Sequence, residues 1–157
     1  MEFDKAKQIT AKLLSFKMYT CREILQKLQQ KGISRETAEL TVGEFCKAGI
    51  LNDEEYAKAY IHDGIFVHMK GIYRLKQELA QKGVASSIIE KAALDAEGSA
   101  EAQLIEYAEL RFGNKEFSDL KELEKAKAHL VRRGYSIYDI NKCFESLGIK
   151  VKRSEEY

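Results

Sequence analysis

The residue types that most often carry out chemistry occur in this chain, but their spacing builds no catalytic motif. His62 and His68 are six residues apart, which places them on different faces of a helix, and no H-E-x-x-H motif is present. The sequence also lacks a G-x-S-x-G elbow, a Walker loop and a G-x-G-x-x-G turn. The carboxylates of Asp53, Glu54 and Glu55 stand where a helix is expected to begin, and there the helix dipole explains them. We therefore expect a protein that is not an enzyme and holds neither a metal nor a cofactor.

The cysteines point to a reducing compartment rather than to a disulfide framework. Cys21, Cys46 and Cys143 are 25 and 97 residues apart, a spacing typical of neither a zinc site nor a redox motif. An odd number of cysteines in a cytosolic chain favours buried free thiols. The first residues include Asp4 and Lys5, and neither a signal peptide nor a membrane-spanning apolar run is visible. We expect a cytoplasmic protein.

Basic and aromatic side chains offer the remaining binding chemistry. Six basic residues at or near expected helix ends are candidate contacts to a partner or to DNA: Lys27, Lys31, Arg74, Lys82, Arg132 and Arg133. Cations at helix C-termini also stabilise the helix dipole, so a purely structural role competes with binding. Four tyrosines can stack on bases, but alanine neighbours favour packing in the core with their hydroxyls at the surface: Tyr56, Tyr60, Tyr107 and Tyr135.

The charge is distributed unevenly along a chain whose net charge is only +1. Residues 1–51 carry nine basic and six acidic side chains, residues 52–102 carry six and nine, and residues 103–153 carry eleven and eight. The three segments therefore have net charges of +3, −3 and +3. Phosphate binding by a whole basic face normally needs a larger excess. The alternation favours a partner of mixed charge and leaves sequence-independent nucleic-acid binding as the alternative.

Three internal repeats are the elements that must position these side chains. Gly32, Gly83 and Gly134 follow one another at intervals of 51 residues, and a gapless overlay at that offset aligns a leucine four positions before each glycine. Repeats of this length indicate stacked helical units. The sequence predicts repeats over 1–51, 52–102 and 103–153, followed by a tail at 154–157.

Each repeat is expected to contain three helices. The absence of proline favours helices, and Thr20 with Glu23 forms a typical capping box. Asn52, Ser87 and Ser136 are expected to cap further helices. No stretch alternates with the period of a strand. We predict an all-α, elongated and curved array with helices at 3–15, 20–31, 35–47, 53–67, 71–82, 86–96, 99–112, 119–132 and 137–147.

Four segments in sequence order resemble the RecX family of regulatory proteins. Residues 49–57 read GILNDEEYA, similar to the family's G-y-L-n-D-x-x-f/y-A, and residues 130–136 read LVRRGYS, similar to L-x-R-R-G-f/y-s. Residues 71–84 resemble the family's G-x-x-x-i/l-x-x-E-L-x-x-K-G-i, and residues 20–32 resemble its S-x-x-E-L-x-x-K-L-x-x-K-G. The resemblance covers about Ala6 to Leu147. We expect these motif residues to be structural: Gly32, Asn52, Asp53, Tyr56, Ala57, Gly71, Leu79, Gly83, Leu130, Gly134 and Tyr135.

The resemblance implies tandem three-helix repeats and a non-enzymatic regulator of the RecA recombinase. Such a protein is expected to bind the RecA filament on DNA as a monomer and to inhibit its recombination, ATPase and co-protease activities in the SOS response. Two other hypotheses about the function remain open. One is a sequence-independent nucleic-acid-binding repeat protein, and the other is a helical scaffold for an unrelated partner.

Overall fold

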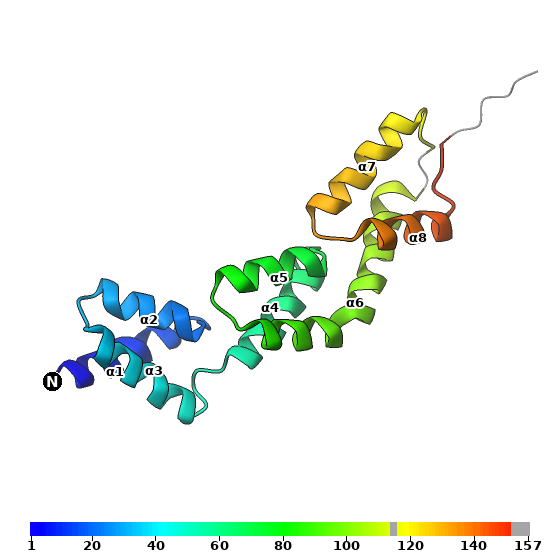
Figure 1. Ribbon diagram of the computed structural model, residues 1–157. Helices are drawn as coiled ribbons and strands as arrows, with labels where there is room; N and C mark the ends of the chain where they lie inside the picture. The colour runs from blue at the N-terminus through cyan, green and yellow to red at the C-terminus, as the bar shows by residue number, and fades with distance from the viewer. Residues whose placement is uncertain (114–115, 152–157) are drawn as a thin grey trace, which may run out of the picture. The chain divides into compact units, whose positions relative to one another are not determined.

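The computed structural model describes residues 1–113 and 116–151, and within them every regular element is an α-helix (Figure 1). The all-α fold is confirmed. One isolated bridge, between Phe117 and Val151, is the only extended pairing in these ranges. No helix in these ranges has the length and apolar character needed to cross a membrane. The helices are α1 (Glu2–Leu14), α2 (Cys21–Gln30), α3 (Arg35–Lys47), α4 (Asp53–Phe66), α5 (Ile72–Gln81), α6 (Ser86–Phe112), α7 (Leu120–Arg132) and α8 (Ile137–Leu147).

Polar side chains start several of these helices as predicted. The Thr20 hydroxyl accepts the N–H of Glu23 at 3.1 Å, and the Glu23 carboxylate accepts the N–H of Thr20 at 2.9 Å, which completes the capping box. The side chain of Asn52 accepts the N–H groups two and three residues further on, and Ser136 accepts the N–H three residues further on. Ser87 does not cap a helix, because α6 already begins at Ser86.

One predicted helix break is wrong. The sequence places one helix at 86–96 and another at 99–112, but α6 runs through this region as a single helix of 27 residues. Gly98 lies inside it with open space around its Cα, and a helical glycine costs only about 1 kcal/mol relative to alanine. Ala100 and Leu104 are buried beyond it, so burial offsets that cost. The boundary predicted between residues 102 and 103 therefore lies inside a helix, and the described residues form eight helices instead of nine.

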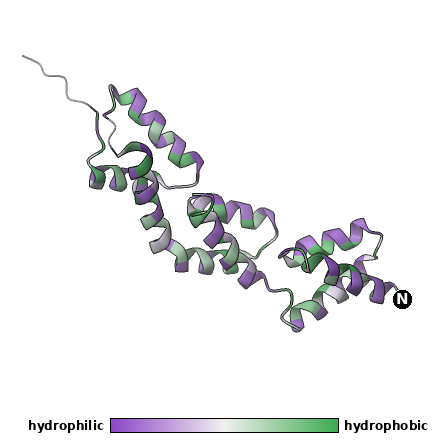
Figure 2. Ribbon diagram, turned by 180° about the vertical axis from the view of Figure 1, so that it is seen from behind, coloured by the Kyte–Doolittle hydropathy of each residue, from purple (hydrophilic) through white to green (hydrophobic). Residues whose placement is uncertain are grey.

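The chain divides into two compact units, and the division falls within α4, α5 and α6. Unit 1 comprises residues 1–60 and 78–92. In its N-terminal part, buried residues recur every three or four positions, as Ile24 and Leu28 do on α2, because one stripe of each helix faces its neighbours. Polar and apolar residues alternate accordingly along the helices (Figure 2). The core there is formed by Ala6, Ile24, Leu28, Ile33, Ala38 and Leu51.

Unit 2 comprises residues 61–77 and 93–157, and its core joins the C-terminal part of α6 to α7 and α8. The Phe112 ring meets the rings of Phe117 and Phe144, with centroid distances of 6.1 and 5.8 Å. Such offset aromatic pairs stabilise a core beyond the area that they bury. Its other buried members are Leu104, Ala108, Leu123, Ala126, Leu130, Tyr135, Ile140, Cys143 and Ile149.

The three aligned glycines share one backbone conformation. Gly32, Gly83 and Gly134 have φ angles of +87°, +86° and +104°, in the left-handed region that favours glycine. In each case the next residue's N–H donates to the carbonyl of the leucine four positions before the glycine, at 3.0 to 3.2 Å. This is the closing bond of a Schellman motif. The same helix stop therefore occurs in all three predicted repeats.

Candidate partner-binding groove

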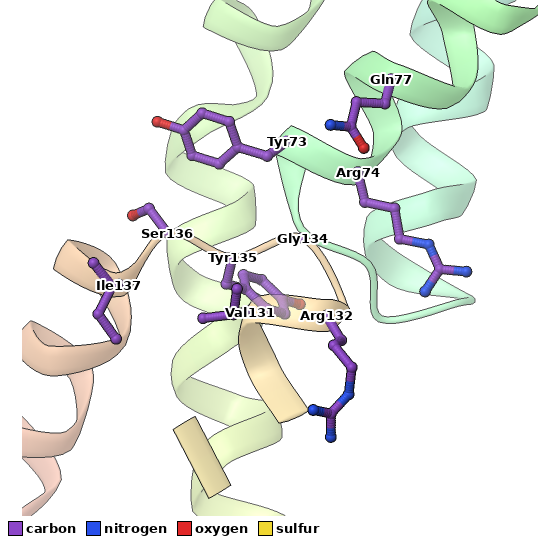
Figure 3. Close-up of a pocket in the computed structure, with 9 residues that line it drawn as sticks. All are labelled: Tyr73, Arg74, Gln77, Val131, Arg132, Gly134, Tyr135, Ser136 and Ile137. Atoms are coloured by element: carbon purple, nitrogen blue, oxygen red, sulfur yellow. The ribbon is translucent and has the colours of Figure 1, made fainter. Parts of the chain in front are cut away.

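An open groove of about 540 Å³ lies in unit 2, where the start of α5 meets the turn between α7 and α8 (Figure 3). Three of its side chains come from the first turns of α5, two from the last turn of α7, and the others from the turn and the start of α8. The lining residues are Tyr73, Arg74, Gln77, Val131, Arg132, Gly134, Tyr135, Ser136 and Ile137.

Two glycines allow the walls of the groove to approach each other. The Gly71 N–H donates to the Arg133 carbonyl at 2.7 Å, and the Tyr73 N–H donates to the Gly134 carbonyl at 3.2 Å. A Cβ added at Gly71 would lie 2.3 Å from the carbonyl carbon of Gly134, and a Cβ added at Gly134 would lie 2.4 Å from the Cβ of Arg74. Both positions therefore require glycine, and the groove has a fixed backbone frame.

Partly buried Arg133 holds this frame through hydrogen bonds to the backbone just before α5. Its Nε donates to the Met69 carbonyl at 2.9 Å, and its Nη2 donates to the carbonyl of His68. The guanidinium also lies 5.4 Å from the ring centroid of Tyr107, a cation–π contact. Met69 has a φ of +51°, unusual for a residue other than glycine, so Arg133 binds the carbonyl of a strained turn just before α5. These guanidinium N–H groups therefore stabilise the fold.

The groove combines exposed apolar surface with positive charge. Tyr73, Val131 and Ile137 are 58%, 47% and 52% exposed. In Figure 3 the side chains of Arg74 and Arg132 extend to one side of Gly134, and those of Tyr73 and Ile137 lie on the other. Aromatic and arginine side chains are the residues that most often dominate binding energy at protein interfaces. This surface suits a partner that presents an apolar side chain next to a carboxylate or phosphate.

Tyr135 forms part of the groove wall with its ring, while its hydroxyl is buried. No hydrogen-bond partner for that hydroxyl lies among the described residues. Burial raises the pKa of Tyr135 to about 12. The predicted surface position of its hydroxyl is therefore wrong. The reason is that the turn after Gly134 directs the side chain into the core of unit 2.

The structure divides the six basic candidate residues between the two units. Lys27, Lys31 and Lys82 lie in unit 1, and only Lys31 among them is exposed. Lys82 Nζ is 3.8 Å from a Glu23 carboxylate oxygen and 5.5 Å from the ring centroid of Tyr60, and Lys27 Nζ lies 5.6 Å from the ring of Tyr19. In unit 2, Arg74 and Arg132 line the groove, whereas Arg133 is not among the lining residues and donates to the Met69 carbonyl.

The family-motif residues have packing, capping or backbone roles. Ala57, Leu79 and Leu130 are fully buried. Tyr56 is buried as well, and burial, followed by the charges of Glu23 and Asp53, raises its pKa to about 12. The Asp53 carboxylate accepts the Cys21 N–H at 3.0 Å. The cysteines are free, but only Cys143 is buried, so the prediction of buried thiols is wrong for exposed Cys46 and half-buried Cys21.

Sequence reasoning missed the apolar half of the groove, although the repeats contain a signal for it. At the offset of 51, Tyr73 aligns with Arg22 and Glu124. Ile137 similarly aligns with a charged residue and a serine in the other repeats. Apolar residues that are exposed together on a surface indicate an interaction site, so this difference between the repeats is the signal that the sequence offered. Among the described residues, no group of three histidine, cysteine or acidic side chains could hold a metal ion.

Comparisons with known proteins give a consistent result. The family model for the first three-helix domain of RecX matches residues 6–45, and the model for the second matches residues 52–92. Regulatory protein RecX of Amycolatopsis mediterranei is 30% identical over 85% of this chain and 77% of its own length. The Streptococcus gordonii protein of that name is 34% identical, but the match spans 35% of its length. The crystal structure of RecX from Lactobacillus salivarius superposes with a TM-score of 0.81 over 94% of this chain and 97% of that one, at 22% identity.

Proposed function

The chain belongs to the RecX family of regulatory proteins, and on that premise we propose that it binds the RecA filament on DNA and inhibits it. The inhibited activities are strand exchange, ATP hydrolysis and co-protease activity in DNA repair. The protein acts in the cytoplasm as a monomer and catalyses no reaction of its own. The groove of unit 2 is the contact surface, and its partner is a surface of the filament that carries both apolar and acidic groups.

The observation that carries this proposal is the chemistry of the groove. Tyr73, Val131 and Ile137 expose apolar surface on a fixed backbone, beside the guanidiniums of Arg74 and Arg132. A rigid frame loses little entropy when a partner binds. The mixed character also agrees with the small net charge of the chain, because a protein that bound DNA alone would need a larger basic excess.

Inhibition follows if the protein binds some filament conformations more tightly than others. A ligand shifts an equilibrium only by its difference in affinity for the two states. A filament repeats the same surface many times, so two binding surfaces on one chain can engage two neighbouring copies. The second contact is then intramolecular and strengthens binding without any new interaction. Exposed Lys31 in unit 1 is the candidate for that second contact.

Co-sedimentation with filaments of RecA on single-stranded DNA tests the groove directly. Arg132→Ala and Tyr73→Ala remove exposed side chains, so the fold should persist while the affinity falls about tenfold or more for the pair. Lys125→Ala is the matched control, because Lys125 is an exposed cation on the same helix outside the groove. If all three variants sediment like the unchanged protein, the groove is not the contact surface.

The alternative function is sequence-independent binding of nucleic acid. The exposed cations Lys31 and Arg132 and the exposed ring of Tyr73 favour it, since cations contact phosphates and aromatic rings stack on bases. Lys82 and Arg133 contribute less, because both make intramolecular contacts. Two results would support nucleic-acid binding. The affinity for bare DNA should fall steeply as salt is added, and a variant that combines Lys31→Ala and Arg132→Ala should lose binding. A partner captured from a lysate without RecA would instead indicate a scaffold.

A further inference from the structure

Two thiols meet in unit 1, whereas the groove belongs to unit 2. Cys21 is the first residue of α2, Cys46 lies near the C-terminal end of α3, and their Sγ atoms are 3.2 Å apart. The S–S bond of a disulfide is about 2.05 Å long, so bond formation requires a movement of little more than 1 Å. Cys46 is exposed and Cys21 is half-buried, and both are free thiols. Sequence spacing gives no indication of this pair, because 25 residues separate its members.

The two thiols have different environments, which assigns them different chemical roles. Burial, the hydrogen bond with Cys46 and the negative charge of Asp53 together raise the pKa of Cys21 above its usual range. Cys21 therefore keeps its proton at neutral pH and is a poor first nucleophile. Cys46 is exposed to solvent and to any dissolved oxidant. Its thiolate is the group that reacts first, and Cys21 is then close enough to resolve the product.

We propose that Cys21 and Cys46 are a modification site, at which hydrogen peroxide forms a reversible intramolecular disulfide. The Cys46 thiolate attacks one peroxide oxygen, the O–O bond breaks, hydroxide leaves, and Cys46 becomes a sulfenic acid. The Cys21 sulfur then attacks Cys46 Sγ, the S–O bond breaks, and a second hydroxide leaves. The protons of the two thiols convert both hydroxides to water. Sulfur is oxidised, peroxide is reduced, and a dithiol reductant reverses the change.

The new bond would fasten three helix ends of unit 1. It joins the start of α2 to the end of α3, and the backbone N–H of Cys21 already bonds to Asp53 at the start of α4. A disulfide restricts the unfolded chain, so the oxidised protein should unfold at a higher denaturant concentration than the reduced protein. Cys143 provides an internal comparison, because it is buried in unit 2 and burial raises its pKa. This inference does not depend on filament binding.

Thiol titration and peptide mapping of the full chain test the pair. After brief treatment with dilute hydrogen peroxide, we expect two of the three thiols to be lost. A peptide containing Cys21 linked to Cys46 should appear, the protein should run as a monomer on non-reducing gels, and dithiothreitol should restore both thiols. The proposal is overturned if peroxide converts Cys46 to sulfinic or sulfonic acid while Cys21 stays reduced. Links between two chains, or oxidation of Cys143 before the pair, would overturn it as well.

A substitution separates the two steps. Cys21→Ser removes the resolving thiol, so Cys46 should now accumulate as a sulfenic acid that dimedone labels. Cys143→Ser is the matched control and should form the disulfide at the unchanged rate. If Cys21→Ser and the unchanged protein show equal dimedone labelling, Cys21 does not resolve the sulfenic acid. Mapping of the unchanged protein does not depend on the folding of any variant.

Discussion

Arg132 and Arg133 show how neighbouring residues of one type acquire different tasks. Arg132 is the last residue of α7, lines the groove and is exposed, whereas Arg133 follows the helix and donates to the carbonyls of His68 and Met69. The sequence indicates that the pair is denser than helix capping requires. It cannot assign the two roles, because the carbonyls that Arg133 binds lie 64 and 65 residues away along the chain.

Replacing the two arginines should separate stability from binding. Arg133→Ala leaves two backbone carbonyls without their charged donor and should lower the free energy of unfolding by about 1–3 kcal/mol. Arg132→Ala removes an exposed side chain and should change it by less than about 0.5 kcal/mol. Urea unfolding monitored by circular dichroism measures both. Equal effects in the two variants would contradict the division of roles.

His129 should make the protein less stable in mild acid. Burial lowers the pKa of His129 from its usual value, and three nearby arginines add to this effect. Its Nε2 lies 2.9 Å from the Tyr107 hydroxyl. In the unfolded chain the imidazole has its ordinary pKa of about 6.5, so near and below that pH the unfolded state binds the proton more tightly. The contribution of His129 is therefore fully present above about pH 6.5 and is lost as the pH falls.

Thermal unfolding between pH 7.5 and 5.5 measures that loss. His129→Gln should flatten the decrease in melting temperature, because glutamine does not titrate. His68→Gln is the control, since the His68 imidazole is exposed, whereas the backbone N–H and carbonyl of His68 are hydrogen-bonded. An equally steep decrease in His129→Gln would show that other groups carry the pH dependence.

At the scale of elements, most helix starts and stops could be predicted from the sequence, whereas the continuity of α6 past Gly98 could not. Thr20 with Glu23 and the three aligned glycines are local signals, and local hydrogen bonds satisfy them. The predicted break near Gly98 is wrong because glycine weakens a helix without ending it when the following residues are buried. The groove depends on the contact between residues 71–73 and 133–134, which local patterns do not encode.

Two glycine substitutions should change the free energy of unfolding in opposite directions. Gly71→Ala places a Cβ 2.3 Å from the Gly134 backbone and should cost about 2 kcal/mol or more, because the frame of the groove must shift. Gly98→Ala meets open space within α6 and should stabilise the protein by about 0.5–1 kcal/mol. Chemical unfolding of both variants gives the two values. A destabilising Gly98→Ala would contradict the continuous helix.

At the scale of the whole molecule, a repeated helical fold carries a surface that is not repeated. The glycine stops recur in all three predicted repeats, but Tyr73 and Ile137 of the groove have polar counterparts in the other two repeats. Repeat arrays build a common scaffold and leave their exposed residues free to diverge. The all-α fold and the family could therefore be inferred from motifs, whereas the groove proposed to bind the partner could be found only from the three-dimensional contacts of unit 2.

The rate of DNA-dependent ATP hydrolysis by RecA, measured while this protein is titrated in, tests the central claim most directly. The unchanged protein and Lys125→Ala should slow hydrolysis with the same half-maximal concentration. The combined Tyr73→Ala, Arg132→Ala variant should need about ten times more protein for the same effect. A rate of hydrolysis that stays constant at saturating concentrations of the unchanged protein would contradict the proposed regulation of RecA.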